Sequence, residues 1–439
     1  MSQTAAATPV GRVTKYRWVV MAILAVFYTM VYADRANIGV ALPLIQNEFK
    51  LTNFQAGSLA SVFFIGYFVT QLPAGFWYSK FGVRGLMSLS IVATSAFTGL
   101  IGAAGSAGLI KLYRFGLGMA EGPCPVGVST TINNWFPPKE KGLANGIYFA
   151  AAKFAPVIVP PVSVWIILHY GWREVFYFFA APGVITAAAL YIFVRNRPEE
   201  SKFCSPAELA YIKDTTIETR AATVQGRQQS FGWLDTLIKA KHVRLLETNR
   251  EVFLSWNIWA NTIAYFMLIN IIYGLLTWIP SYLVKEKHLS LTQMGFVAAM
   301  PWVGAVLGAV AGGRISDIYL GKRRKPLILL STIATIAMML VLINVPGNQI
   351  IIALVLLVTG ILLNLGYPLF VVYPMGLTTS KTYPVANGLA GCTANLGGFF
   401  SPMIAGYLLD VFNYNAVFIF FGVCAAISLL VVLTMEEPI

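Results

Sequence analysis

Long apolar runs separated by short polar segments follow one another along the whole chain. A helix needs roughly 20 apolar residues to cross the hydrocarbon core of a bilayer. Twelve such runs lie at roughly 18–42, 54–78, 84–104, 108–132, 142–168, 173–194, 252–283, 291–315, 326–345, 349–377, 384–409 and 414–434. The pattern predicts an all-α polytopic membrane protein in which twelve transmembrane helices form two pseudo-symmetric six-helix bundles.

One long polar segment, between the sixth and seventh runs, divides the chain. We expect an N-terminal tail at 1–17, a first bundle at 18–194, a linker at 195–250, a second bundle at 251–434 and a short tail at 435–439. The first apolar run is too long for a signal peptide, so the N-terminal tail is expected to be retained. Within the linker, Ser-Pro-Ala-Glu predicts a short amphipathic helix over 205–213, because serine followed by glutamate three residues later is a helix-capping signal.

The basic residues are distributed unequally between the two sides of such a bilayer protein. The chain has 57% hydrophobic and 11% charged residues and a net charge of +13. Of its 31 Lys and Arg, we place 23 on the side of the linker, 5 in the opposite loops and 3 within spans. Loops rich in Lys and Arg stay on the cytoplasmic side of a membrane. Both termini are therefore expected in the cytoplasm, with the protein in the bacterial inner membrane. Anchoring to lipid headgroups explains the basic linker more simply than nucleic acid does.

Five charged side chains lie inside the spans of the first bundle, where each costs several kcal/mol unless it is paired or faces water. They are Asp34, Arg35, Arg114, Glu121 and Lys153. Burial favours the neutral form of a carboxyl, whereas a nearby guanidinium favours the ionised form. Asp34 and Glu121 are therefore the candidate proton carriers. The alternative is that both acids are static partners of the two arginines.

The spacing of these residues suggests different roles. Asp34 and Arg35 are adjacent and point about 100° apart on a helix. We therefore expect Arg35 to face the cavity and bind substrate, and Asp34 to face a neighbouring helix. Arg114 and Glu121, seven residues apart, share a helix face about 10 Å apart along the axis. An anion can lie beside or between them, unless Arg114 snorkels to the outer interface near Lys111.

Lys153 and the uncharged polar residues complete the candidate site. Lys153 either contacts a second anionic group of the substrate or only neutralises Glu121 or Asp34. The second bundle has no well-buried charge and is expected to hydrogen-bond hydroxyls. Its polar span residues are Asn257, Asn261, Tyr265, Asn270, Tyr273, Asn364, Tyr367, Tyr373, Asn387 and Asn395. Substrate contacts are predicted for Asn395 and for Tyr32, which lies half a turn from Asp34.

A turn motif occurs twice, once in each half. Gly75-x3-Ser79-x2-Gly82-x-Arg84 follows the second span, and Gly313-x3-Asp317-x3-Gly321-x-Arg323 follows the eighth. Glycines suit a tight turn between closely packed helices. The repeat indicates two parallel halves with a substrate site between them near the membrane midplane, and these eight residues are predicted to form a gate.

Further motifs extend over nearly the whole chain. They are Asp34-Arg35-Ala36-Asn37, Arg114-x6-Glu121-Gly122-Pro123, Asn134-Trp135-Phe136-Pro137 with Glu140-Lys141-Gly142, and Thr277-Trp278-Ile279-Pro280-Ser281-Tyr282-Leu283. With the turn motif, they resemble the major facilitator superfamily and, more narrowly, its anion:cation symporters, which include hexonate, hexuronate, glucarate and sialin-type carriers. The chain departs from that pattern at Ser79, where an Asp is usual and a gate contact would be weakened, and at Lys153, where a neutral residue is usual.

The resemblance implies roles for individual residues. Acids matching Asp34 and Glu121 couple protons, and arginines matching Arg35 and Arg114 hold the substrate's carboxylate or contact the acids. Tyr67 matches a substrate-contacting tyrosine position.

The combined expectation is a monomeric, proton-coupled importer of a small organic anion, such as a sugar acid or a related mono- or dicarboxylate. It would rock two bundles about a central site. The proton is its coupling ion, and no other cofactor or metal is expected. Two acids and three bases give the site one net positive charge, and more when the acids are protonated, so the protonated site attracts an anion most strongly.

The alternatives are an exchanger or uniporter without protons and a membrane sensor that binds the anion without moving it. An enzyme is not expected, because no nucleophile paired with a base stands out in the sequence.

Overall fold

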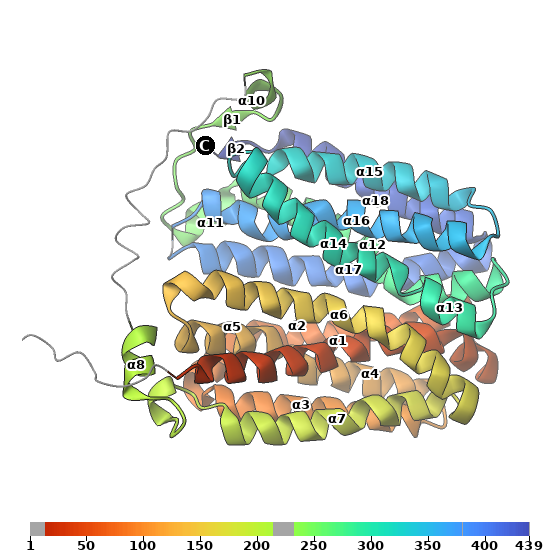
Figure 1. The fold of residues 1–439 in the computed structure, drawn as a ribbon. Helices are drawn as coiled ribbons and strands as arrows, with labels where there is room; N and C mark the ends of the chain where they lie inside the picture. Colours follow the sequence, from red (N-terminus) through yellow and green to blue (C-terminus); the bar gives the residue numbers. More distant parts are fainter. Residues whose placement is uncertain (1–13, 214–231, 380, 439) are drawn as a thin grey trace, which may run out of the picture.

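Two bundles of long helices lie side by side in the computed structural model, which describes residues 14–213, 232–379 and 381–438 (Figure 1). The first bundle consists of α1 (Tyr16–Glu48), α2 (Asn53–Phe81), α3 (Val83–Gly102), α4 (Ala107–Glu121), α5 (Cys124–Trp135), α6 (Pro138–Tyr170) and α7 (Trp172–Phe193). The second consists of α12 (Trp256–Lys285), α13 (Leu291–Val297), α14 (Met300–Arg314) with η2 (Ile315–Tyr319), α15 (Lys325–Ile343), α16 (Gln349–Val372) with η3 (Tyr373–Gly376), α17 (Tyr383–Val411) and α18 (Tyr414–Thr434).

The helices correspond to the twelve predicted spans. In the described part of the chain, ten helical segments are long and apolar enough to cross a membrane. The other two predicted spans are α17 and the pair α4 and α5. The fourth span is interrupted after Glu121 because Pro123 lacks an N–H and Gly122 packs against the Tyr67 carbonyl, where a side chain would collide. The predicted two-bundle fold is thus confirmed, and Glu121 lies at a break in its helix.

The linker docks in two pieces at one end of the bundles, which we call the linker end, the opposite end being the far end. Its elements are η1 (Pro198–Glu200), α8 (Pro206–Ile212), α10 (Trp233–Leu237), β1 (Ala240–Lys241) and α11 (Asn249–Leu254). The predicted helix at 205–213 is confirmed as α8, capped by Ser205. Glu208 binds the Arg17 guanidinium of α1 at 2.8 Å. β1 pairs in parallel with β2 (Glu437–Pro438) beyond α18. Each piece is therefore fixed to its own bundle.

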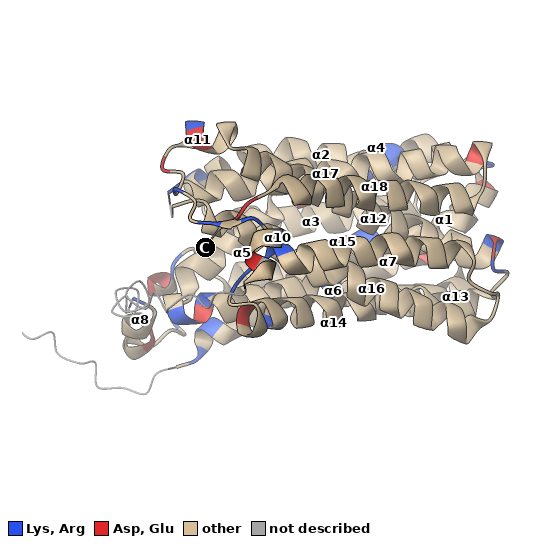
Figure 2. Cartoon of the chain, turned by 90° about the horizontal axis from the view of Figure 1, so that it is seen from above, with Lys and Arg blue, Asp and Glu red and all other residues tan. Residues whose placement is uncertain are grey.

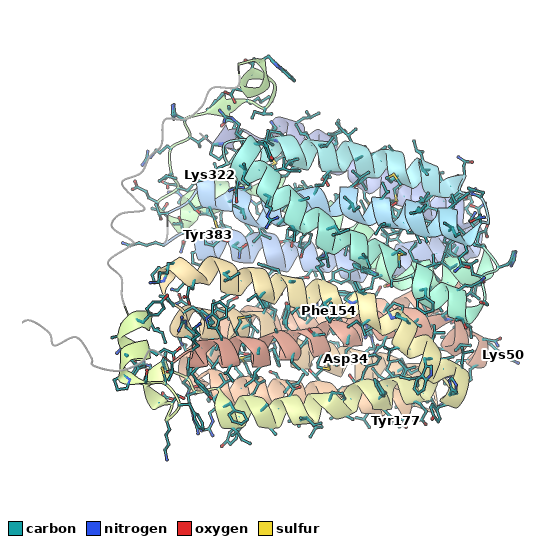
Figure 3. All side chains as sticks on the ribbon, in the orientation of Figure 1. Asp34, Lys50, Phe154, Tyr177, Lys322 and Tyr383 are labelled. Atoms are coloured by element: carbon teal, nitrogen blue, oxygen red, sulfur yellow. The ribbon has the colours of Figure 1, made fainter. Side chains whose placement is uncertain are left out.

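Charged residues gather at the ends of the helices, and most densely at the linker end (Figure 2). Asp34 lies about midway between Lys50 at the far end and Lys322 at the linker end (Figure 3). Asp34 therefore lies far from both charged ends of the bundles.

The two bundles are packed tightly against each other in the far half. A β-carbon on Gly57 of α2 would collide with the Pro402 carbonyl of α17, and one on Gly39 of α1 would collide with the Leu276 carbonyl of α12. Such close backbone approach is available only to glycine. We call this contact the far seam.

The linker half of the same interface is open. Eighteen residues are five full helical turns, so residues 18 apart lie on one helix face. Gly57 and Gly75 stand in this relation on α2, as do Gly406 and Gly388 on α17. Gly57 and Gly406 meet backbone of the opposite bundle, whereas a β-carbon on Gly75 or Gly388 would meet nothing within 4 Å. The bundles therefore diverge toward the linker end.

The two copies of the turn motif lie at this open end, and their polar contacts stay on one side of the gap. Arg84 donates to the Tyr191 carbonyl at 2.6 Å, and Ser79 donates to the Phe76 carbonyl at 2.8 Å. Asp317 pairs with Arg324, and Arg323 pairs with Asp235 of the linker, each at 2.6 Å. Gly82 and Gly321 have φ of 76° and 56°, as their turns require, and Gly313, like Gly75, faces open space. The gate role of the motif stays a prediction.

Asp410 of α17 stabilises the far seam by capping the N-terminus of α2. Its two carboxylate oxygens accept the backbone N–H groups of Asn53 and Phe54, at 2.7 and 2.8 Å, at the N-terminus of α2. A helix N-terminus carries partial positive charge and unpaired N–H donors, so a carboxylate stabilises it. Asp410→Ala should weaken the seam by about 0.5–2 kcal/mol, the usual cost of losing a helix cap.

We expect this substitution to populate a conformation that is open at the far end. The measurement is the distance distribution between spin labels at the exposed far-end positions Ala103 and Gly347, one on each bundle. Asn413→Ala is the control, because Asn413 caps α18 within its own bundle. It should lower stability without lengthening the distances. Identical distributions for Asp410→Ala and the unmodified protein would contradict the role of Asp410.

Candidate functional site

Arg35 lies at the centre of the interface between the bundles. Its Nε donates to Oε2 of Glu121 at 3.0 Å, and its Nη1 donates to the hydroxyl of Tyr273 on α12 at 3.0 Å. The side chains of Arg35 and Glu121 are 2% and 0% exposed. One guanidinium thus connects α1 to α4 in its own bundle and to α12 in the other.

Aromatic rings enclose this guanidinium. Its carbon lies 4.6 Å from the ring centres of Tyr32 and Tyr67 and 5.2 Å from that of Phe63. The electron-rich faces of the rings stabilise the cation at distances of this kind. The predicted residues Tyr32 and Tyr67 therefore do join Arg35, and Phe63, which the sequence did not single out, joins them.

The ion pair leaves hydrogen-bonding capacity unused. An arginine fork can hold a carboxylate through two parallel bonds. Here Nη2 of Arg35 and Oε1 of Glu121 are buried and have no hydrogen-bond partner among the described residues. Arg35 therefore has a donor for a further anionic oxygen, and Glu121 has an oxygen that can take a proton.

Asp34 points away from Arg35, as the helix geometry predicts. Its Oδ1 accepts from Asn37 Nδ2 at 3.2 Å, and the side chain is buried within the first bundle. Since no ion pair joins Asp34 to an arginine in the described part of the chain, the alternative that both acids are static partners of the two arginines is not seen at Asp34.

Arg114 does not snorkel to the surface. Only 1% of the residue is exposed. All three of its nitrogen groups donate to backbone carbonyls, Nη1 to Asp34 at 3.0 Å, Nε to Leu59 at 3.3 Å and Nη2 to Ala60 at 3.4 Å. The snorkelling alternative is wrong because the fork is used to join α4 to α1 and α2. A contact between Arg114 and substrate stays a prediction.

Lys153 of α6 reaches across the interface. Its Nζ donates to Oδ1 of Asn364 on α16 at 3.2 Å and lies 4.0 Å from the ring centre of Tyr367. No carboxylate of the described residues lies within 4 Å of this ammonium, so it does not pair with Glu121 or Asp34. Of the two roles expected for Lys153, the neutralising one is therefore not seen.

Several uncharged polar residues of the second bundle differ in what they contact. Asn261 and Asn270 donate to carbonyls of their own bundle and act in helix packing. Tyr273 and Asn364 receive hydrogen bonds from the first bundle. Asn395 donates to the Gly391 carbonyl at 2.9 Å and is partly exposed on the α17 face that borders the open half of the interface. Its contact with substrate stays a prediction.

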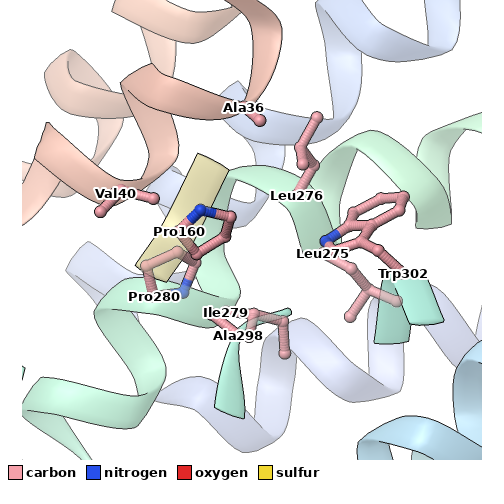
Figure 4. Close-up of a pocket in the computed structure, with 9 residues that line it drawn as sticks. All are labelled: Ala36, Val40, Pro160, Leu275, Leu276, Ile279, Pro280, Ala298 and Trp302. Carbon is pink, nitrogen blue, oxygen red and sulfur yellow. The ribbon is translucent and has the colours of Figure 1, made fainter. Parts of the chain in front are cut away.

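A small void lies between α1, α6, α12 and α14 (Figure 4). Its lining is apolar and comes from both bundles: Ala36, Val40, Pro160, Leu275, Leu276, Ile279, Pro280, Ala298 and Trp302. With no charged group in its lining, it is a packing defect of the closed half and not the candidate site.

Comparisons with known proteins show which family and which relatives this chain is similar to. Residues 24–381 match the family described as Major Facilitator Superfamily. A probable galactarate/D-glucarate transporter of Bacillus subtilis is 29% identical, covering 99% of this chain and 95% of its own. A probable sulfoacetate transporter of Cupriavidus necator is 27% identical over 97% of this chain and 96% of its own. A hexuronate transporter of Bacillus subtilis is 25% identical over 93% and 92%.

Solved structures share the fold at low sequence identity. A bacterial homologue of the human lysosomal transporter Spinster, in an inward-facing and occupied conformation, has a TM-score of 0.75 at 17% identity, covering 96% of this chain and 97% of its own. A D-xylose–proton symporter has a TM-score of 0.71 at 16% identity, covering 96% and 98%. These likenesses concern the architecture alone.

The two buried arginines should respond differently to replacement by lysine. Lysine at position 114 replaces three separate nitrogen atoms with one, so it should leave at least one of the three carbonyls unpaired. Arg114→Lys should therefore cost about 1–3 kcal/mol of stability, the range for unsatisfied buried groups. Arg35→Lys keeps a cation beside Glu121 but loses the fork, so it should retain the fold and lose anion binding.

The melting temperature of the purified protein, with and without a panel of organic anions, separates these effects. We expect Arg114→Lys to melt lower without ligand. Arg35→Lys should melt near the unmodified protein and show no stabilisation by anions. A large loss of stability in Arg35→Lys with anion binding retained would contradict this assignment of roles.

Proposed function

The chain belongs to the Major Facilitator Superfamily, and we propose that it is a proton-coupled symporter that imports a small organic anion, a sugar acid or a related mono- or dicarboxylate. The observation that carries the proposal is the buried Arg35 guanidinium at the bundle interface, with Nη2 unpaired beside a carboxyl that can take a proton. The relatives, which include a probable galactarate/D-glucarate transporter and a hexuronate transporter, support an organic anion as cargo.

Glu121 couples the proton to the anion by competing for Arg35. While Glu121 is ionised, it occupies Nε of Arg35. Protonation removes that charge and leaves the guanidinium to a substrate carboxylate, which binds arginine through the same fork. When the proton leaves, the restored ion pair displaces the anion. Asp34, buried at the same level one residue earlier, adds a second carboxyl whose charge opposes anion binding.

The direction of release follows from the basic residues. The linker end is the more basic, and positively charged loops stay on the cytoplasmic side. We therefore place both termini in the cytoplasm and assign the conformation that is open at the linker end to the inward-open state. In a bacterium this orientation corresponds to the inner membrane.

Import requires a second conformation in which the far seam opens and the linker end closes. The glycine faces of α2 and α17 continue into the open half at Gly75 and Gly388. At the linker end, these glycine faces can pack as closely as they do in the far seam. In that state the turn motif would meet the opposite bundle, with Ser79 contributing a hydroxyl where Asp317 contributes a charge.

The coupling role of the acids is tested by neutral replacements in reconstituted vesicles. Asp34→Asn and Glu121→Gln mimic the protonated carboxyls. We expect each to abolish uphill uptake driven by a proton gradient, because the carboxyl can no longer release its proton. Counterflow of substrate between equal concentrations should persist, since it needs no net proton movement.

The same measurement distinguishes the alternatives. An exchanger or uniporter without proton coupling would show uphill uptake and counterflow equally intact in both variants. A sensor that does not transport would bind the anion and show neither flux in the unmodified protein.

A further inference from the structure

The competition between Glu121 and substrate for Arg35 assigns no role to Lys153. Lys153 is 9% exposed and lies deep in the protein. An ammonium has three donors. The described residues supply one hydrogen-bond acceptor, Asn364 Oδ1, together with the face of Tyr367. A buried cation without an anionic partner is costly. We therefore expect an anionic group that is not a carboxylate of the described residues to stabilise this ammonium.

Lys153 lies at nearly the same depth as Arg35. Two contacts fix the register of the parallel helices α1 and α6: the Tyr28 and Tyr148 rings have centres 4.3 Å apart, and the Thr29 hydroxyl donates to the Ala151 carbonyl at 3.4 Å. Lys153 is therefore level with residues 31 to 33, two to four residues from Arg35, or about 3–6 Å along the helix axis. It lies on the linker side of Arg35, toward the open half.

An aromatic ring lies against each of the two cations. The Tyr32 ring packs against the Arg35 guanidinium, and the Tyr367 ring packs against the Lys153 ammonium. Both cations also reach the second bundle, Arg35 at Tyr273 and Lys153 at Asn364. A short, extended molecule held between the bundles at this depth would meet a cation near each end.

We propose that Lys153 binds a second anionic group of the substrate and that the preferred cargo is a small dianion, a dicarboxylate or a sulfonated carboxylate. The proposal rests on the symport function above and names its substrate class. One carboxylate binds Arg35. The other anionic group takes the remaining donors of Lys153, beside Asn364 of the opposite bundle.

The charge of the site agrees with a dianion. Three bases and two ionised acids give the empty site a net charge of +1. Protonation of Asp34 and Glu121 raises it to +3, and a bound dianion returns it to +1. A monoanion bound to the doubly protonated site would leave a charge of +2 in the membrane interior, which is more costly than the empty site. A constant buried charge of +1 therefore requires two protons with a dianion, whereas a monoanion requires one proton.

The test compares matched anions that differ by one charge: D-glucarate with D-gluconate, and sulfoacetate with acetate. Binding to the purified protein and uptake into vesicles are measured for each. A charge-assisted hydrogen bond contributes about 1.5–3 kcal/mol, equivalent to roughly tenfold to a hundredfold in affinity. We expect the unmodified protein to prefer at least one dianion over its monoanion by about this factor.

Lys153→Gln should remove that preference by weakening the dianion alone, while the affinity for the monoanion changes little. Lys153→Arg restores a cation and should retain the preference. Lys50→Gln removes the same charge from an exposed far-end position and is the control, with an unchanged preference expected.

Two results would overturn the inference. The first is an equal loss of dianion and monoanion binding in Lys153→Gln, which would make Lys153 a general structural element. The second is an unmodified protein that binds the monoanions as well as or better than the dianions, or that binds neither dianion. Proton-coupled uptake of gluconate or acetate in that case would leave the symport function standing. Absence of proton-coupled uptake for every anion would contradict the symport function itself.

Discussion

The contact between Arg35 and Glu121 is the constraint on which the rest of the site depends. Both side chains are buried in the middle of the molecule, and an isolated charge there would cost several kcal/mol. Pairing reduces that cost but does not use all of the hydrogen-bonding groups, since Arg35 Nη2 and Glu121 Oε1 remain without partners in the described chain. A pair that is stable yet incomplete can be displaced, which a fully bonded pair resists. A proton on Glu121 and an anion on Arg35 then both weaken this one bond, so each favours the binding of the other.

The division of charge between the bundles gives this bond mechanical consequences. Arg35 and Lys153 belong to the first bundle, and their contacts across the interface, Tyr273 and Asn364, belong to the second. Whatever binds both cations therefore also rearranges the contacts between the bundles at their centre. The glycine faces on either side of this centre are packed at the far end and separated at the linker end. A change at the midplane can thus favour one seam over the other.

The sequence predicts the fold well and the site only in part. Apolar run length places the spans, the capping signal places α8, and the cost of buried charge selects Asp34, Arg35, Arg114, Glu121 and Lys153 without any structural information. Helix periodicity also separates the directions of Asp34 and Arg35. Periodicity shows on which face of its helix a side chain lies, but not which neighbouring helix packs against that face. The carbonyl partners of Arg114 and the contact of Lys153 with Asn364 therefore required the three-dimensional packing. Phe63 had no signal, since one phenylalanine in an apolar helix looks like any other.

Proton movement on addition of substrate is the most direct measurement of the central claim. Vesicles containing the protein are suspended in weakly buffered medium without a proton gradient, and external pH is recorded as D-glucarate, D-gluconate or sulfoacetate is added. Symport predicts that the medium becomes alkaline for each anion that enters the vesicles, and that protein-free vesicles show no change. Entry of a labelled anion with no change in external pH would contradict proton coupling through Asp34 and Glu121.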